Sequence, residues 1–453
     1  MLPVGSELDL DRSVLRAIRQ QAVPLTGELD QLDGLLEMIG DAGVVLLGEA
    51  SHGTHEFYHL RAELTRRLIV EKDFAAVAVE ADWPDAWRVN RYVLGDSDDC
   101  SAVEALRGFE RFPEWMWRNT EVLDFVAWLR DHNANVATEE GRTGFYGLDL
   151  YSLHRSMSEV IDYLSRVDPE AAERARIRYG CLDRHGPDPQ NYGLLAISGV
   201  DASCREEVSR QLAELRAMEA ELLSRDGRPA LDAYFFAEQN ARLVANAEAY
   251  YRQIFRSDVS TWNLRDQHMM ETLVELMAHL QTVEGRAKVV VWAHNSHLGD
   301  ARATAMARRG ERNLGQLVRE TFATQSRLIG FTTYAGTVTA ATGWHSPGRQ
   351  MSLRPGQEGS YEKLFHQVGI PAFWLDLSDG NPAALGLREP RLERAIGVVY
   401  RPEREARSHY FEACLGRQFD AVIHQDLTRA VEVLDHPGEW PVDEAPETFP
   451  HGL

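Results

Sequence analysis

The sequence is poor in lysine and has no long apolar run. Lysine occurs only at positions 72, 288 and 363, so arginine supplies almost all of the positive charge, and no cluster of basic residues is present. Because the net charge is −22, the chain lacks the basic surface that binding a nucleic acid requires. No apolar stretch reaches about 18 residues, and charged residues interrupt the amino terminus. We therefore expect no nucleic-acid partner, no membrane span and no signal peptide.

Cysteine is also scarce. The four cysteines stand at positions 100, 181, 204 and 414, and no two have the CxxC spacing. This pattern predicts neither a zinc knuckle nor a disulfide framework, and a reducing cytoplasm is the simplest location.

Three common motifs of catalysis and phosphate binding are missing. The sequence has no G-x-S-x-G element, no GxxxxGK[ST] loop and no GxGxxG loop. Their absence argues against a serine esterase of the nucleophile-elbow type and against a phosphate-binding loop. If the protein is a hydrolase, we expect an activated water molecule to attack the substrate directly.

Short apolar segments alternate with helical patterns along most of the chain. This alternation predicts an α/β fold with a mainly parallel central sheet flanked by helices. We expect strands at residues 44–47, 75–79, 144–148, 288–292, 327–332, 372–377, 397–400 and 419–423. The region between the third and fourth strands is almost wholly helical. It predicts a large helical insertion or lobe, at residues 151–283, that forms the wall of a cleft, between a first part of the α/β core (1–150) and a second part (284–453).

The turn after the first predicted strand carries four ionisable residues. Glu49, His52, His55 and Glu56 follow the apolar residues 44–47, at the carboxyl end of a strand, where open α/β sheets place their ligand sites. A buried strand normally ends in small or amide-bearing residues, so catalysis is the leading interpretation. His52 could also be a structural hydrogen bonder. His55 and Glu56 lie in a first helical turn, where the negative charge of Glu56 interacts favourably with the helix dipole.

Other predicted strands end in similar residues. Glu80 follows the second strand, and His294 and His297 follow the strand at 288–292. Because the carboxyl ends of parallel strands share one edge of a sheet, these groups can meet there. A histidine can take a proton from water near neutral pH, and a carboxylate can fix its tautomer. The structural alternatives are that Glu80 caps the next helix and that His297 only orients its neighbour.

Two arginines complete the set of candidate site residues. Arg61 lies nine residues after His52, and Arg265 lies near the start of a predicted helix. Arginine suits a carboxylate site or a developing oxyanion, although either residue could be an ordinary surface charge.

A metal site is the main rival interpretation. Histidines and carboxylates from different strands can also hold zinc or manganese. The HxxH spacings are weaker signals than an HExxH helix, and no third ligand motif is evident, so we predict no metal and no cofactor. Two alternatives remain. One is a metal-dependent hydrolase whose substrate is not a carboxylic ester, and the other is a non-catalytic protein that binds a small molecule.

The stretch Gly48-Glu49-Ala50-Ser51-His52-Gly53-Thr54-His55-Glu56-Phe57 resembles the signature of the erythromycin esterase family. Further blocks follow in the order of that family, at residues 79–83, 145–149, 263–266, 292–297 and 419–424. The resemblance therefore covers most of the chain.

The resemblance implies hydrolysis of the lactone ester of a macrolide antibiotic, and hence resistance, without a serine nucleophile or an obligatory metal. It implies that His52 is the general base and that Glu49 is its carboxylate partner. It places Arg61 and Glu80 in the active-site cluster and lets His294 polarise the ester carbonyl. His297, His55 and Arg265 are then the candidate substrate-binding residues. The expected partner is a small-molecule ester or lactone, and the sequence predicts no oligomeric state.

Overall fold

A nine-stranded sheet is the centre of the protein. The computed structural model describes residues 4–186, 188–198, 203–226, 229–256 and 258–434. The strand order is β1-β8-β11-β6-β2-β5-β3-β4, and β7 pairs with β6. The strands of this sheet are β1 (Val23–Pro24), β2 (Val44–Leu47), β3 (Ala76–Asp82), β4 (Gly144–Asp149), β5 (Val289–Trp292), β6 (Ser326–Ala340), β7 (Arg349–Leu353), β8 (Ala372–Asp376) and β11 (Ala421–Thr428). β9 (Arg391–Arg394) and β10 (Tyr410–Ala413) form a separate antiparallel pair.

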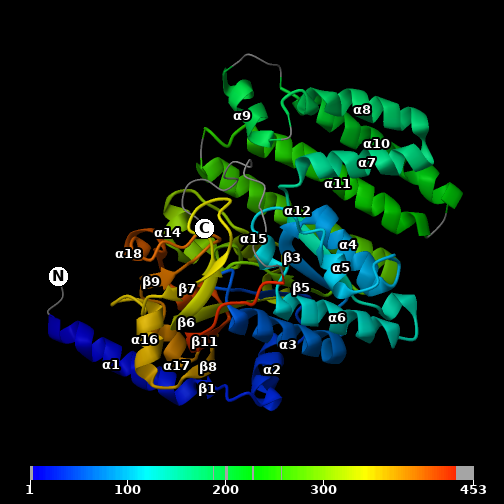
Figure 1. Ribbon diagram of the computed structural model, residues 1–453. Coiled ribbons are helices and arrows are strands. Elements are labelled where there is room, and N and C mark those ends of the chain that lie inside the picture. Colours follow the sequence, from blue (N-terminus) through cyan, green and yellow to red (C-terminus); the bar gives the residue numbers. More distant parts are fainter. Residues whose placement is uncertain (1–3, 187, 199–202, 227–228, 257, 435–453) are drawn as a thin grey trace.

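Helices flank this sheet (Figure 1). They are α1 (Val4–Gln21), α2 (Asp33–Ile39), α3 (His55–Lys72), α4 (Trp83–Leu94), α5 (Ala102–Leu106), α6 (Thr120–Ala134), α7 (Leu153–Val167), α8 (Pro169–Asp183), α9 (Pro189–Ser198), α10 (Arg205–Asp226), α11 (Pro229–Tyr251), α12 (Asp258–Glu284), α13 (Asn295–Leu298), α14 (Ala305–Arg308), α15 (Leu314–Phe322), α16 (Tyr361–Val368), α17 (Pro382–Gly386), α18 (Glu405–Ser408) and α19 (Leu415–Gln418). Short 3-10 helices are η1 (Leu29–Leu32), η2 (Glu114–Met116), η3 (Glu139–Gly141), η4 (Ala301–Ala303) and η5 (Ala323–Gln325). The predicted fold class, α/β with a mainly parallel sheet, is confirmed.

The run β11-β6-β2-β5-β3-β4 is parallel throughout. β2 lies between β5 and β6, so that Val45 pairs with Val290 on one side and with Arg327 on the other. β2 and β5 are continuous apolar runs and are fully buried, as strands covered on both faces are. Because these strands point the same way, the turns after β2 and β5 and the ends of β3 and β4 lie at one edge of the sheet.

One predicted strand is wrong. Residues 397–400 form no strand, and Val399 makes only an isolated bridge to Ala341. The segment is apolar because its residues are buried. Burial alone does not provide the ladder of hydrogen bonds that a strand needs. The sequence analysis also missed β1, β7, β9 and β10, which are short or largely polar.

The described residues between β4 and β5 form α7 to α12. In Figure 1, α7 to α11 gather at the top of the molecule, whereas α12 lies closer to the sheet and contacts β4. α11 packs against both α7 and α10. Their apolar side chains, such as Leu215 and Leu243, belong to the same buried cluster as Leu46 and Val291 of the sheet. The division into a helical lobe and two parts of a core stays a prediction.

Cys181 and Cys204 form a disulfide that joins α8 to the segment before α10, with their Cα atoms 5.9 Å apart. The sequence analysis predicted no disulfide framework and missed this single pair. The two residues are 23 positions apart and have no recognisable spacing motif, so the sequence carried no signal. Cys100 and Cys414 are free thiols. The predicted cytoplasmic location stays a prediction.

None of the helices in the described residues combines the length and the apolar character that crossing a membrane requires.

Gly53 leaves no room for a side chain in the turn after β2. Its carbonyl accepts hydrogen bonds from the N–H groups of Thr339 and Val431, and a Cβ on Gly53 would lie 1.8 Å from the Thr339 carbonyl oxygen. We expect Gly53→Ala to lower the free energy of unfolding by about 1–3 kcal/mol, because the backbone must shift. Urea unfolding measures this, with Gly43→Ala as control, since a Cβ there meets nothing within 4 Å. Equal losses in the two variants would contradict the prediction.

Candidate active site

Glu49, His52 and Arg61 form a buried chain of polar contacts behind the turn after β2. The Nδ1 of His52 lies 2.9 Å from Oε1 of Glu49. Arg61, on α3, donates from Nη2 to the other oxygen, Oε2, at 2.7 Å, and its guanidinium lies over the rings of Tyr58 and Trp292. Since a carboxylate only accepts, Nδ1 of His52 carries the hydrogen. Nε2 of His52 therefore has the free lone pair.

His294 has the opposite tautomer. It caps α13, and its Nδ1 accepts a hydrogen bond from the backbone N–H of Ser296 at 3.2 Å. Nε2 therefore carries the hydrogen of the neutral ring, and the ring also interacts with the backbone of Ala50. The ring centroid lies 4.9 Å from that of His52. Burial, and next the nearby His52, hold the pKa of His294 well below its usual value, so the ring is neutral near pH 7.

Arg265, on α12, joins two carboxylates. It donates from Nε and Nη2 to the two oxygens of Asp149, at 3.0 and 2.6 Å, and from Nη2 to Oε1 of Glu80 at 2.7 Å. The other oxygen of Glu80 accepts the backbone N–H of His294 at 2.9 Å. Glu80 is buried, which opposes ionisation, but the charges of His297 and Arg265 hold its pKa well below its usual range. Glu80 thus ties the end of β3 to the turn after β5.

His297 lies within this network. Its Nδ1 is 2.9 Å from Oδ2 of Asp266, and its Nε2 is 3.0 Å from Nη1 of Arg265 and 3.4 Å from Glu80. Its ring stacks on Trp262 with centroids 4.4 Å apart. Burial opposes protonation, yet Asp266 and Glu80 raise the pKa of His297. Both ring nitrogens face protein groups.

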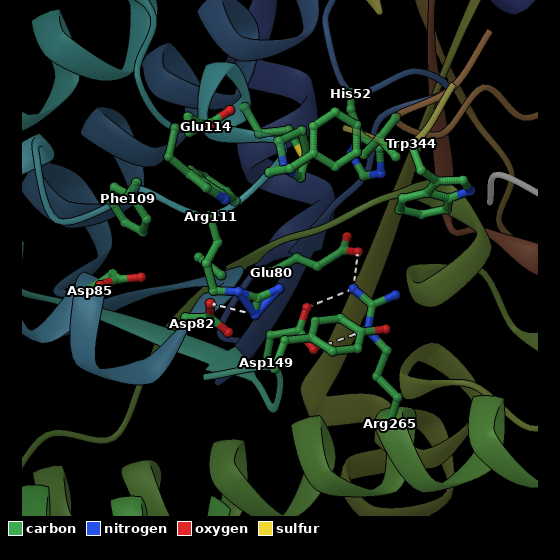
Figure 2. A pocket seen from close by; sticks show the side chains of 17 residues that line it. His52, Glu80, Asp82, Asp85, Phe109, Arg111, Glu114, Asp149, Arg265 and Trp344 are labelled. Atoms are coloured by element: carbon green, nitrogen blue, oxygen red, sulfur yellow. Dashed lines mark hydrogen bonds and ion pairs between the residues drawn. The ribbon is translucent and has the colours of Figure 1, made fainter. Parts of the chain in front are cut away.

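A pocket with a volume of about 90 Å³ lies in front of these groups (Figure 2). Its polar lining includes His52 from the turn after β2, Glu80 from β3 and Arg265 from α12. Its remaining lining residues come mainly from strand ends and from loops: Ala81, Asp82, Asp85, Phe109, Arg111, Phe112, Pro113, Glu114, Met116, Trp117, Asp149, Tyr151, Trp344 and Val398.

The structure brings most of the candidate residues together. Among these candidates, the pocket-lining residues are His52, Glu80 and Arg265. Glu49, His294 and His297 contact them from behind, and Arg61 contacts Glu49. His55 is placed differently. Its Nδ1 bonds to Glu121 on α6, and it does not line the pocket. The roles of all these residues stay predictions.

Several residues of the site escaped the sequence analysis. Asp149 ends β4 and Asp82 ends β3, so both carry the same strand-end signal as Glu80. Asp266 lies next to Arg265 in a recognised block, but nothing in the sequence shows that it faces His297. Arg111 and Trp344 stand in loops, where no periodic pattern indicates direction.

The described residues contain no group of three or more His, Cys, Asp and Glu side chains arranged to hold a metal ion. Within the site, Glu80 and Asp149 already bind Arg265, and Glu49 binds Arg61 and His52. The described residues of this site therefore contain no set of side chains arranged to bind a metal ion, as the metal interpretation would require.

The low pKa of His294 predicts a loss of stability in acid. The unfolded chain protonates this histidine below pH about 6.5, while the folded protein keeps it neutral, so stability falls as pH falls through that value. We expect His294→Gln to reduce this loss by about 1.4 kcal/mol per pH unit below pH 6. Urea unfolding from pH 7.5 to 5 measures the difference. Parallel curves for the two proteins would contradict the prediction.

The fold and the site together define a class: α/β proteins whose buried histidines and carboxylates gather at the carboxyl ends of a parallel sheet. A sequence model of the erythromycin esterase family matches residues 69–428. The chain belongs to the erythromycin esterase family. The matched range begins after the turn at residues 48–57, so the family match depends on the later part of the chain.

Individual relatives agree with this membership. Erythromycin esterase type II from Escherichia coli is 24% identical over 420 residues, which cover 89% of this chain and 94% of that protein. A Bacillus cereus protein of known structure superposes with a TM-score of 0.78 at 22% identity, covering 94% of this chain and 99% of that one. A mutant of erythromycin esterase EreC, in its open conformation, superposes with a TM-score of 0.66 at 17% identity, covering 94% of this chain and 98% of that one. At these identities the structures show the shared fold alone.

Proposed function

We propose that this protein hydrolyses a carboxylic ester or lactone with a water molecule that His52 activates. The observation that supports it most is the buried hydrogen bond between Nδ1 of His52 and Glu49. This bond fixes the tautomer that leaves Nε2 free to accept a proton, and Arg61 holds Glu49 in place from the other side. A general base positioned in this way is worth about 10² to 10⁴ in rate.

The proposed reaction has two steps. Nε2 of His52 takes a proton from water while the water oxygen bonds to the ester carbonyl carbon, and the carbonyl oxygen becomes an oxyanion. The tetrahedral species then collapses, the bond to the alkoxy oxygen breaks, and protonated His52 returns its proton to the leaving alcohol. No covalent bond to the protein forms.

His294 is the proposed donor to the oxyanion. The ring is neutral near pH 7, so its Nε2–H can donate once the substrate carbonyl replaces the backbone of Ala50 as its partner. One such donor is worth about 10² to 10³ in rate. His294 lies next to His52 but does not line the pocket. The carbonyl can therefore reach it only if the pocket widens.

Substrate size leads to the same requirement. The pocket of about 90 Å³ is smaller than the 300–1,000 Å³ typical of sites for drug-sized ligands. The names of the family and of its relatives suggest a macrolide as the substrate. A macrolide needs a wider pocket than this one. We propose that the substrate is a macrolide lactone, which binds to a form of the protein with a more open pocket. Resistance to such antibiotics would be the consequence.

A panel of substrates tests this function. The purified protein is incubated with 14- and 16-membered macrolides and with aryl esters, with and without a chelator, and products are analysed by mass spectrometry. The proposal predicts a gain of one water that survives chelation. Loss of activity only with the chelator would instead support a metal-dependent hydrolase. No turnover of any ester would overturn the proposed function.

A further inference from the structure

Asp266 is a buried carboxylate behind the pocket, and the proposed hydrolysis does not use it. It follows Arg265 on α12 and does not line the pocket. Both of its oxygens face Nδ1 of His297, which belongs to α13, at 3.0 and 2.9 Å. Oδ1 also accepts the backbone N–H of Leu314, the first residue of α15, at 2.7 Å. Three helices therefore meet at this carboxylate.

The contact with Asp266 keeps a hydrogen on Nδ1 of His297. Burial raises the pKa of Asp266. Burial opposes protonation of His297, yet Asp266 and Glu80 raise the pKa of its ring. The pair therefore retains a proton between the ring and the carboxylate. Trp262 holds the ring in this orientation, because the two rings stack with planes only 8° apart.

The opposite ring nitrogen of His297, Nε2, meets Arg265. It lies 3.0 Å from Nη1 of that guanidinium. Because Nδ1 carries the hydrogen of the neutral ring, Nε2 has the lone pair that accepts this N–H. In the protonated ring Nε2 donates instead, and Oε1 of Glu80, 3.4 Å away, is its acceptor. Asp266 suits both states of the ring, since each has a hydrogen on Nδ1.

Four of the five N–H groups of Arg265 are bonded within the protein when His297 is neutral. Nε–H and one N–H of Nη2 bond to Asp149, and the other N–H of Nη2 bonds to Glu80 (Figure 2). One N–H of Nη1 bonds to His297. The fifth, also on Nη1, has no acceptor among the described residues. Because Arg265 lines the pocket, this N–H is the one that a substrate can accept.

We propose that Asp266 is a positioning residue for the hydrolysis and acts through His297 on Arg265. By fixing the tautomer of His297, it holds the guanidinium so that the fifth N–H can donate to the substrate oxygen on which negative charge develops. The inference rests on the proposed function and adds a second donor to His294. Glu80 links the two donors, because its oxygens accept Arg265 and the backbone N–H of His294.

The variant Asp266→Asn reverses the contact and keeps the shape of the side chain. The amide oxygen can still accept the N–H of Leu314, so the amide NH₂ group turns toward Nδ1 of His297. The neutral ring then accepts at Nδ1 and carries its hydrogen on Nε2, where it opposes the N–H of Arg265. We expect kcat for an aryl ester to fall about 10- to 100-fold. KM should change little, because such a donor binds the oxyanion more tightly than the ground-state carbonyl.

Asp300→Asn is the matched control. Asp300 is also buried, accepts the backbone N–H at the start of η4 and pairs with Arg302. It does not line the pocket. A purely structural effect of losing a buried carboxylate appears in both variants, whereas loss of positioning appears only in Asp266→Asn. We expect kcat of Asp300→Asn to stay close to the wild-type value.

A double-mutant cycle shows whether the effect passes through His297. Asp266→Asn is introduced into the wild type and into His297→Gln, and kcat is measured for all four proteins. If Asp266 acts through the ring, its replacement should change kcat of His297→Gln by less than about twofold. Equal losses in the two backgrounds would show that Asp266 acts independently of His297.

NMR spectroscopy determines the tautomer without any measurement of activity. Protein with ¹⁵N-labelled histidine rings is studied from pH 6 to 9, and the His297 signals are identified by their absence from His297→Gln. We expect a hydrogen on Nδ1 in the wild type at every pH. In Asp266→Asn the neutral ring should carry its hydrogen on Nε2.

The outcomes separate the inference from the proposed function. If the wild type hydrolyses an ester but Nδ1 of His297 lacks its hydrogen, the inference is wrong and the proposed function stands. The same holds if Asp266→Asn keeps the wild-type kcat, loses no more than Asp300→Asn, or loses as much in the His297→Gln background. If the wild type hydrolyses no ester, the proposed function fails and the inference fails with it.

Discussion

Replacing His52 by alanine is expected to lower kcat/KM for ester hydrolysis by about 10² to 10⁴. The ring is buried at the edge of the pocket, and its Nδ1 is held by Glu49. Without it, no described side chain is held in the same way in front of the pocket to take a proton from water. Initial rates with an aryl ester and with any macrolide that is cleaved measure the effect.

A matched variant controls for the loss of a histidine. His59 lies on α3, close in sequence to His52, but its side chain is exposed. His59→Ala should retain activity within about threefold, because surface substitutions rarely change the fold. If His52→Ala kept a similar share of the wild-type rate, His52 would not be the general base.

Replacing Arg265 by methionine is expected to lower the free energy of unfolding by about 3–5 kcal/mol. The methionine leaves the carboxylates of Asp149 and Glu80 buried without the guanidinium that both now bind. An unpaired buried charge is costly because it has lost its water and gained no partner. Urea unfolding, followed by circular dichroism, measures the change in midpoint.

The control for this change is an exposed arginine. Arg302 pairs with Asp300, but its side chain is 51% exposed, and exposed ion pairs contribute about 0–1 kcal/mol. Arg302→Met should therefore shift the midpoint little. Adding Asp149→Asn to Arg265→Met should recover part of the loss, because it removes one of the unpaired charges. Equal, small shifts for both arginine variants would show that the buried network is not important for stability.

The sheet and the turn after β2 could be predicted because their signals are local. Residues 44–47 and 288–292 are apolar runs followed by abrupt groups of ionisable residues, and such runs become buried parallel strands. Parallel strands share one edge, so Glu49, Glu80 and His294 could be expected to meet. The same reasoning predicts that Asp149, at the end of β4, also lies at this edge, but the sequence analysis did not include it among the site residues.

The rest depended on contacts that no local pattern encodes. Arg265 meets Asp149 across 116 positions of sequence. His52 and His55 are three residues apart, yet one faces the pocket and the other meets Glu121, because α3 begins between them and turns the second side chain toward α6. The pocket wall formed by Arg111 and Trp344 comes from loops.

The most direct test of the central claim follows the oxygen of water. A single turnover of an ester is run in H₂¹⁸O with excess wild-type enzyme, and both the acid product and the intact protein are analysed by mass spectrometry. The account predicts one ¹⁸O in the carboxylate product, an unmodified protein mass throughout the reaction, and product formation that is about 10² to 10⁴ slower with His52→Ala. A covalent adduct on the protein, or a first-turnover product without the label, would contradict direct attack by water that His52 activates.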